Sequence, residues 1–107
     1  MKRLKINGLV WNIQIDNNMS LDYLGCTEYF NQTISINSKV KGNENIKRTI
    51  THEVIHAYLY SYGFTNKDNF ELEQMIEFIS HNVANIQKLA NEVYRKLVLI
   101  WKRKLEI

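Results

Sequence analysis

The sequence predicts an α+β fold in which a small antiparallel sheet is followed by an amphipathic helix and a long C-terminal helical segment. Two observations predict it. Apolar and polar residues alternate with a period of two in Val10–Asp16 and in Thr33–Asn37, and apolar residues recur every three or four positions after Gly42. The 107 residues contain no proline, low-complexity segment or internal repeat. We therefore expect a single domain spanning residues 1–107.

Four short strands are expected in the first part of the chain. Asn7 and Gly8 form a dipeptide that is favoured in tight hairpin turns, and Asn31-Gln32 is placed to make a second turn. The strands flank these turns. In Val10–Asp16 and Thr33–Asn37, apolar side chains alternate with polar ones, as is typical of half-buried strands. The expected strands are Leu4–Ile6, Val10–Asp16, Thr27–Phe30 and Thr33–Asn37.

Two helical segments are expected in the second part. Asn43 or Asn45 is placed to cap the first helix, and Gly63 is placed to end it. The second begins near residues 68–69, and its apolar pattern continues to Trp101. It contains neither glycine nor proline, so the sequence does not show whether it is one helix or two. Because this segment is longer than a small domain usually buries, we expect a bend or a partner.

The first helix carries the HExxH motif His52-Glu53-Val54-Ile55-His56. Residues four apart on a helix lie one turn above each other, so both imidazoles can bind one tetrahedral metal ion. Glu53 is offset from them and is suited to act as the general base, taking a proton from water and passing it to a leaving amine. The chain has three histidines in all, and two of them fall in this spacing. We expect Zn²⁺, which suits imidazole ligands and hydrolysis.

A catalytic zinc site usually has a third protein ligand. The candidates lie on the next helix, where Glu73, Glu77 and His81 are spaced four apart and Glu71 lies nearby. Glu73 is the first choice because it lies one turn into the helix, near the loop that returns from Gly63. Glu77 and His81 remain the alternatives.

Tyrosines near the motif are candidates for stabilising a developing oxyanion. Tyr60 lies one turn after His56 on the same side of the helix. Tyr62 and Tyr29 are weaker candidates. Tyrosines more often form amphipathic edges of a core, and that role remains the alternative.

Cys26 offers a competing set of ligands. Peptide deformylases combine HExxH with an upstream cysteine ligand that follows a glycine, as Gly25-Cys26 does here. The glycine-rich N-terminal motif of deformylases is absent from this sequence. An incidental buried cysteine is therefore favoured.

Several features indicate a cytoplasmic protein. A single cysteine excludes an internal disulfide and fits a reducing compartment. The basic N-terminus leads into no apolar run of signal-peptide length. The longest wholly apolar stretch, Leu97–Trp101, is far too short to span a membrane. We expect no membrane association.

The net charge of +3 is concentrated near the C-terminus. Such a basic helical end is more often a solvated face than a nucleic-acid surface, and no aromatic residues are interleaved with it. The apolar positions from Val93 to Trp101 offer a dimer surface, so we expect a monomer or a weak homodimer. The basic residues are Lys88, Arg95, Lys96, Lys102, Arg103 and Lys104.

Four stretches of the chain resemble small phage and prophage metallopeptidase-like proteins, which are compact relatives of the ImmA/IrrE group of zinc-dependent peptidases. The resemblance covers Leu9–Leu89. It implies a minimal zincin-like fold in which Ile34–Asn37 is the edge strand that binds substrate as an added strand. The matching stretches are Thr33–Ile36, Thr49–Ala57, Gly63 and Glu73–Ser80.

The resemblance also implies a function. Members with a known role cleave or inactivate a transcriptional repressor, often within mobile elements. We therefore expect a zinc-dependent peptidase that hydrolyses a peptide bond in an intracellular protein, such as a phage or host transcriptional regulator. The alternative is a catalytically silent module on the same scaffold that sequesters a regulator or another protein. Glu53 favours the enzyme, because a binding module has no chemical need for a general base.

Overall fold

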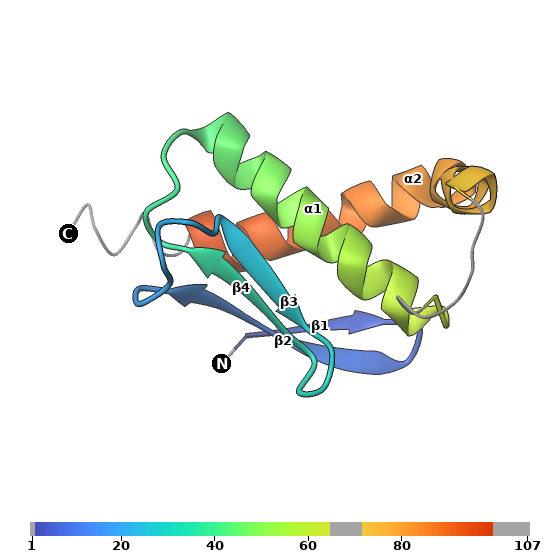
Figure 1. The fold of residues 1–107 in the computed structure, drawn as a ribbon, viewed down its shortest axis with the longest axis horizontal. Helices are drawn as coiled ribbons and strands as arrows, with labels where there is room; N and C mark the ends of the chain where they lie inside the picture. The colour runs from blue at the N-terminus through green and yellow to red at the C-terminus, as the bar shows by residue number, and fades with distance from the viewer. Residues whose placement is uncertain (1, 65–71, 100–107) are drawn as a thin grey trace.

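A computed structural model describes residues 2–64 and 72–99, except for the side chains at positions 72, 73 and 99. Its fold is α+β, with one four-stranded sheet and two helices, as the sequence predicts (Figure 1). The elements are β1 (Lys2–Ile6), β2 (Leu9–Asp16), β3 (Gly25–Glu28), β4 (Thr33–Asn37), α1 (Asn43–Ser61), α2 (Leu72–Tyr94) and the π-helical segment η1 (Arg95–Leu99).

The sheet is mixed, so the expectation of a purely antiparallel sheet is wrong. Its strand order is β1-β2-β4-β3. β1 pairs antiparallel with β2 and β3 pairs antiparallel with β4, whereas β4 pairs parallel with β2. In the hairpin of β3 and β4, the second strand, β4, lies beside β2 and runs in the same direction as β2. Alternation of side chains is the same in both kinds of pairing, so the sequence pattern does not distinguish them.

Both hairpin turns lie where the sequence predicts them. Asn7 and Gly8 have positive φ angles of 48° and 83°, as a two-residue turn of this type requires, and Ile6 pairs with Leu9. The second turn is longer than expected, because Tyr29 to Gln32 separate the last pair of β3 and β4, Glu28 with Thr33. β3 therefore covers Gly25–Glu28 rather than the expected residues 27–30.

The core lies between one face of the sheet and the two helices (Figure 1). Alternate residues of β1, β2 and β4 face the helices, and the residues between them form the more polar opposite face. Removing this apolar surface from water is the main force that holds the helices on the sheet. The buried core residues include Leu4, Ile6, Trp11, Ile13, Ile34 and Ile36 from the sheet and Ile50, Val54, Ala57, Ile86, Ala90 and Val93 from the helices.

The two ends of α1 differ from each other in how they are capped. Neither expected asparagine occupies the N-cap position, which Gly42 holds with φ 90° and no side-chain hydrogen bond. Gly63 ends the helix as predicted. Its φ is 90°, its N–H donates to the Tyr60 carbonyl and the N–H of Phe64 donates to the Leu59 carbonyl. This pair of bonds is a Schellman motif, in which glycine takes the left-handed conformation without a steric cost.

The second helical segment runs without a break from Leu72 to Tyr94 and continues as η1. Its expected start at residues 68–69 lies outside the described residues, as does Trp101. Val93, Leu97 and Val98 are buried in the core, so these positions do not form the dimer surface that the sequence offered. No helix in the described ranges is long and apolar enough to cross a lipid bilayer.

The position of α1 on the sheet depends on Ile50, whose side chain is fully buried. We expect Ile50→Ala to lower the free energy of unfolding by about 2–5 kcal/mol, because it leaves a cavity between helix and sheet. Urea denaturation followed by circular dichroism measures this change. Ile76→Ala is the matched control, since Ile76 is 54% exposed on α2 and its truncation should change stability by less than about 0.5 kcal/mol. Equal effects of the two substitutions would contradict this account of the core.

Candidate metal and catalytic site

The two histidines of the HExxH motif converge on one point above α1. The Nε2 atoms of His52 and His56 lie 3.3 Å apart, and the ring planes are inclined at 67°. Two zinc–nitrogen bonds of about 2.0–2.1 Å at a tetrahedral angle place their nitrogens about 3.3 Å apart. The side chains therefore already have the spacing of two ligands to a single zinc ion.

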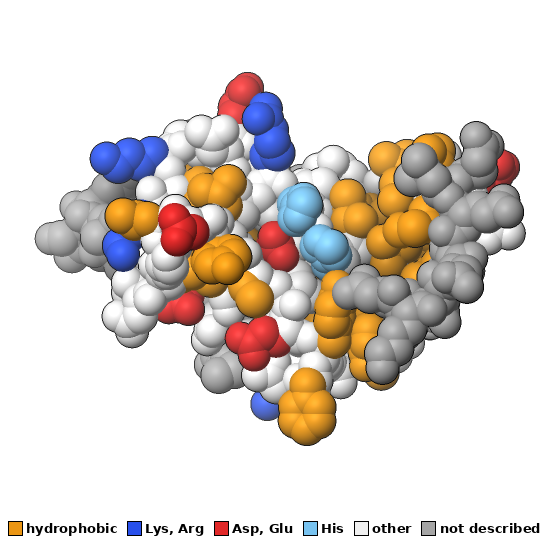
Figure 2. Space-filling view, viewed as in Figure 1, with side chains coloured by type: hydrophobic (Ala, Val, Ile, Leu, Met, Phe, Trp, Pro, Cys, Tyr) orange, Lys and Arg blue, Asp and Glu red, His pale blue; other side chains and the backbone are white. Residues whose placement is uncertain are grey.

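This pair of histidines is accessible from outside. His52 is exposed and His56 is half-buried. The space-filling view shows two histidine side chains next to each other in the middle of one face, beside an acidic side chain (Figure 2). A metal ion and a substrate can therefore reach this site without a rearrangement of the core.

Glu53 lies on the same helix but is turned toward the sheet. Its side chain is only 6% exposed. The Thr27 hydroxyl donates a hydrogen bond to Oε1 at 2.8 Å, which fixes the carboxylate between α1 and β3. A buried carboxylate is stable only when its oxygens have partners, and Thr27 supplies one. Among the described residues Oε2 has no hydrogen-bond donor, so this oxygen is left to accept a proton.

Gly25 permits the close approach of β3 to α1 at this point. A Cβ added to Gly25 would lie 3.0 Å from Cγ of Glu53, 3.1 Å from the methyl carbon of Thr49 and 3.1 Å from the backbone oxygen of Ser35. The backbone oxygen belongs to the paired strand and has little freedom to move. A residue larger than glycine would therefore push β3 away from Glu53.

The Tyr29 hydroxyl lies 3.2 Å from Nδ1 of His56. When Nδ1 of His56 carries the ring proton, it donates a hydrogen bond to the Tyr29 oxygen. The lone pair of Nε2 is then free for a metal ion. Burial raises the pKa of the Tyr29 hydroxyl, and the negative charges of Glu53 and Cys26 raise it further. Tyr29 is therefore a neutral phenol at ordinary pH and does not place a negative charge against the imidazole.

Tyr60 packs against Tyr29 and so supports the contact between Tyr29 and His56. Its ring stacks on Tyr29 with centroids 4.9 Å apart and packs edge-on against Trp11 at 5.8 Å. Of the three tyrosines considered from the sequence, the hydroxyl of Tyr29 contacts the motif, whereas Tyr62 packs against Tyr58 and Phe78. Tyr29 and His56 are 27 positions apart in the chain, and no periodic pattern in the sequence indicates their contact.

The third ligand is not found among the described side chains. Glu73 lies in the first turn of α2, and its side chain is outside the description. Glu77 and His81 do share one face of α2, where Oε1 and Nε2 lie 3.3 Å apart in an exposed pair. No group of three side chains suited to a metal ion occurs within residues 2–64 and 72–99. Glu73 therefore remains a prediction.

Cys26 does not share the site with the histidines. It pairs with Ser35 in the register of β3 and β4, whereas Gly25 and Thr27 face α1, so Cys26 lies on the opposite face of the sheet. Burial, followed by the negative charges of Glu28 and Glu53, raises the pKa of the Cys26 thiol.

Comparison with protein-family models, with curated proteins and with solved structures finds no match.

The contact between Tyr29 and His56 predicts that Tyr29→Phe weakens zinc binding by about 10–100-fold, because it removes the partner that orients the imidazole. Competition with a chromogenic chelator measures the affinity. Tyr94→Phe is the control. The Tyr94 ring lies 5.0 Å from the Lys47 ammonium, a contact that does not use the hydroxyl. Unchanged affinity in Tyr29→Phe would show that Tyr29 does not position His56.

The identity of the third ligand is tested by zinc content. We expect elemental analysis of the untagged protein to find about one zinc ion per chain. His56→Ala and Glu73→Ala should lose it, whereas Glu77→Ala and Cys26→Ser should retain it. Loss of zinc in Glu77→Ala alone among the glutamate variants would assign Glu77 as the ligand instead.

Proposed function

We propose that this chain is a zinc-dependent peptidase with a minimal zincin-like fold, in which His52 and His56 bind the metal and Glu53 is the general base. The observation that carries the proposal is the convergence of the two Nε2 atoms at 3.3 Å on the helix that also presents Glu53. This arrangement has the spacing that one zinc ion requires and a proton acceptor beside it. Glu73 is proposed as the third ligand.

Each residue of the site then has a defined task. Zinc, when bound, supplies a Lewis acid that polarises the peptide carbonyl and makes water more acidic. Glu53 accepts a proton at Oε2 and returns it to the leaving amine, while Thr27 holds Oε1 in place. Tyr29 fixes the ring of His56. Tyr60 is proposed to stabilise the developing oxyanion, and its ring also packs against Tyr29.

The substrate strand is proposed at β3 rather than at β4. The expectation that Ile34–Asn37 is an edge strand is wrong, because β4 is paired with β2 on one side and β3 on the other. β3 is the edge next to α1. The Asn37 N–H donates to the Leu24 carbonyl, and the alternation of an antiparallel pair then turns the N–H and C=O groups of Gly25 and Thr27 toward the free edge. An extended peptide can pair with these groups directly beside Glu53.

The substrate is proposed to be a protein inside the cell, such as a phage or host transcriptional regulator, cleaved in the cytoplasm. This part rests on the resemblance carried by the HExxH helix and the glutamate-bearing segment that follows Gly63. The active unit is proposed to be a monomer or a weak homodimer, without nucleic acid or membrane.

The enzyme and the binding module are separated by Glu53→Gln. This variant should bind zinc like the wild type but cleave peptides about 10²–10⁴-fold more slowly, because the proton acceptor is lost. Digestion of a mixed peptide library, followed by mass spectrometry, measures cleavage, and elemental analysis measures zinc. Wild-type protein that is loaded with zinc and cleaves nothing would favour the module that acts by sequestering a partner.

A further inference from the structure

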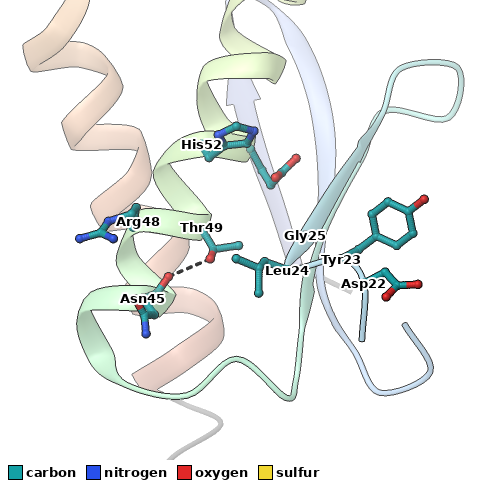
Figure 3. A pocket seen from close by; sticks show the side chains of 9 residues that line it. Asp22, Tyr23, Leu24, Gly25, Asn45, Arg48, Thr49 and His52 are labelled. Atoms are coloured by element: carbon teal, nitrogen blue, oxygen red, sulfur yellow. Dashed lines mark hydrogen bonds between the residues drawn. The ribbon is translucent and has the colours of Figure 1, made fainter. Parts of the chain in front are cut away.

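A pocket of about 360 Å³ adjoins the candidate catalytic residues. It lies between the first half of α1 and the segment that leads into β3, and His52 and Glu53 form part of its wall (Figure 3). Its volume falls in the range of pockets that hold small ligands or side chains. The pocket and the site therefore form one continuous surface.

The centre of the pocket is apolar. Leu24 points from the strand side toward Thr49 on α1 (Figure 3). The Thr49 hydroxyl donates to the Asn45 carbonyl at 2.8 Å, and its methyl group is turned toward Gly25. Leu24 and Thr49 both line the pocket, and Gly25 lies between Leu24 and β3's next residues without a side chain of its own.

Besides Glu53, the charged residues that line this pocket are Asp22 and Arg48. Asp22 extends away from α1, and Arg48 lies on the other side of the helix from Leu24 (Figure 3). Tyr23 and Leu24 are 62% and 60% exposed, although both are large apolar residues. Neighbouring exposed apolar side chains at the rim of a pocket are typical of a binding surface.

From these contacts we infer that the pocket binds an apolar side chain of the peptide substrate, at a position next to the bond that is cleaved. The inference rests on the proposed peptidase function for its reaction and adds the class of substrate residue. A peptide paired along β3 directs every second side chain toward α1. One such side chain enters the pocket between Leu24 and Thr49, while the neighbouring peptide bond lies beside Glu53 and His52. Apolar selectivity follows because the two side chains on either side of this position, Leu24 and the Thr49 methyl, offer apolar surface.

The test compares Leu24→Asn with Leu21→Asn. Both residues are exposed leucines of the same loop, at 60% and 77%, but only Leu24 lines the pocket. Digestion of a mixed peptide library by the zinc-loaded wild type should show aliphatic or aromatic residues enriched at one position flanking the cleaved bond. Leu24→Asn should lower kcat/KM for those peptides about 10-fold or more and flatten the preference, with zinc content unchanged. Leu21→Asn should match the wild type in both measurements.

A second measurement tests the pocket even if no peptide is cleaved. Capped tripeptides with a central leucine or a central aspartate are titrated into the wild-type protein, and amide shifts are followed by NMR. The leucine peptide should shift the signals of Leu24, Gly25 and Thr49, and the aspartate peptide should not. Shifts without cleavage would support the pocket and overturn the peptidase. Cleavage with no apolar preference, or with equal profiles for Leu24→Asn and Leu21→Asn, would overturn the pocket and leave the peptidase standing.

Discussion

The rotation of α1 about its own axis is fixed by the burial of one apolar face against the sheet, and the candidate site depends on that rotation. Ile50, Val54 and Ala57 are each fully buried. With these three positions turned inward, His52 and His56 project outward from the helix. Glu53, one residue after His52, is turned to the side where β3 lies. The same packing that stabilises the domain thus sets the directions in which His52, His56 and Glu53 leave the helix.

A chain of aromatic contacts links the core to the metal-facing histidines. Trp11 is buried, and its indole N–H donates to the Ser61 hydroxyl at 2.9 Å. Tyr60 packs edge-on against Trp11 and stacks on Tyr29, which contacts His56. Because aromatic rings are rigid and have few rotamers, they can hold a surface residue in place at a small cost in conformational entropy. Positioning groups of this kind come from distant parts of the chain.

Local patterns in the sequence predict local features of the structure. The hairpin at Asn7-Gly8, the end of α1 at Gly63 and the HExxH helix all depend on residues within one or two turns of each other, and all three are confirmed. The parallel pairing of β2 with β4 was not predictable, because alternation is the same in both directions. The contacts of Thr27 with Glu53 and of Tyr29 with His56 join separate elements, and no spacing rule reports them. The identity of the edge strand depends on that topology and was therefore missed with it.

The two histidines of the candidate site lie outside the hydrophobic core, whereas the side chain of Glu53 is buried. Among the described residues, the buried hydrophobic core contains apolar side chains and Tyr58 but no histidine, cysteine or carboxylate. In small zinc-dependent domains whose ligands replace a core, loss of the ion unfolds the chain. Here the imidazoles of His52 and His56 lie outside that core, so a zinc ion bound as proposed would lie at the surface of the domain.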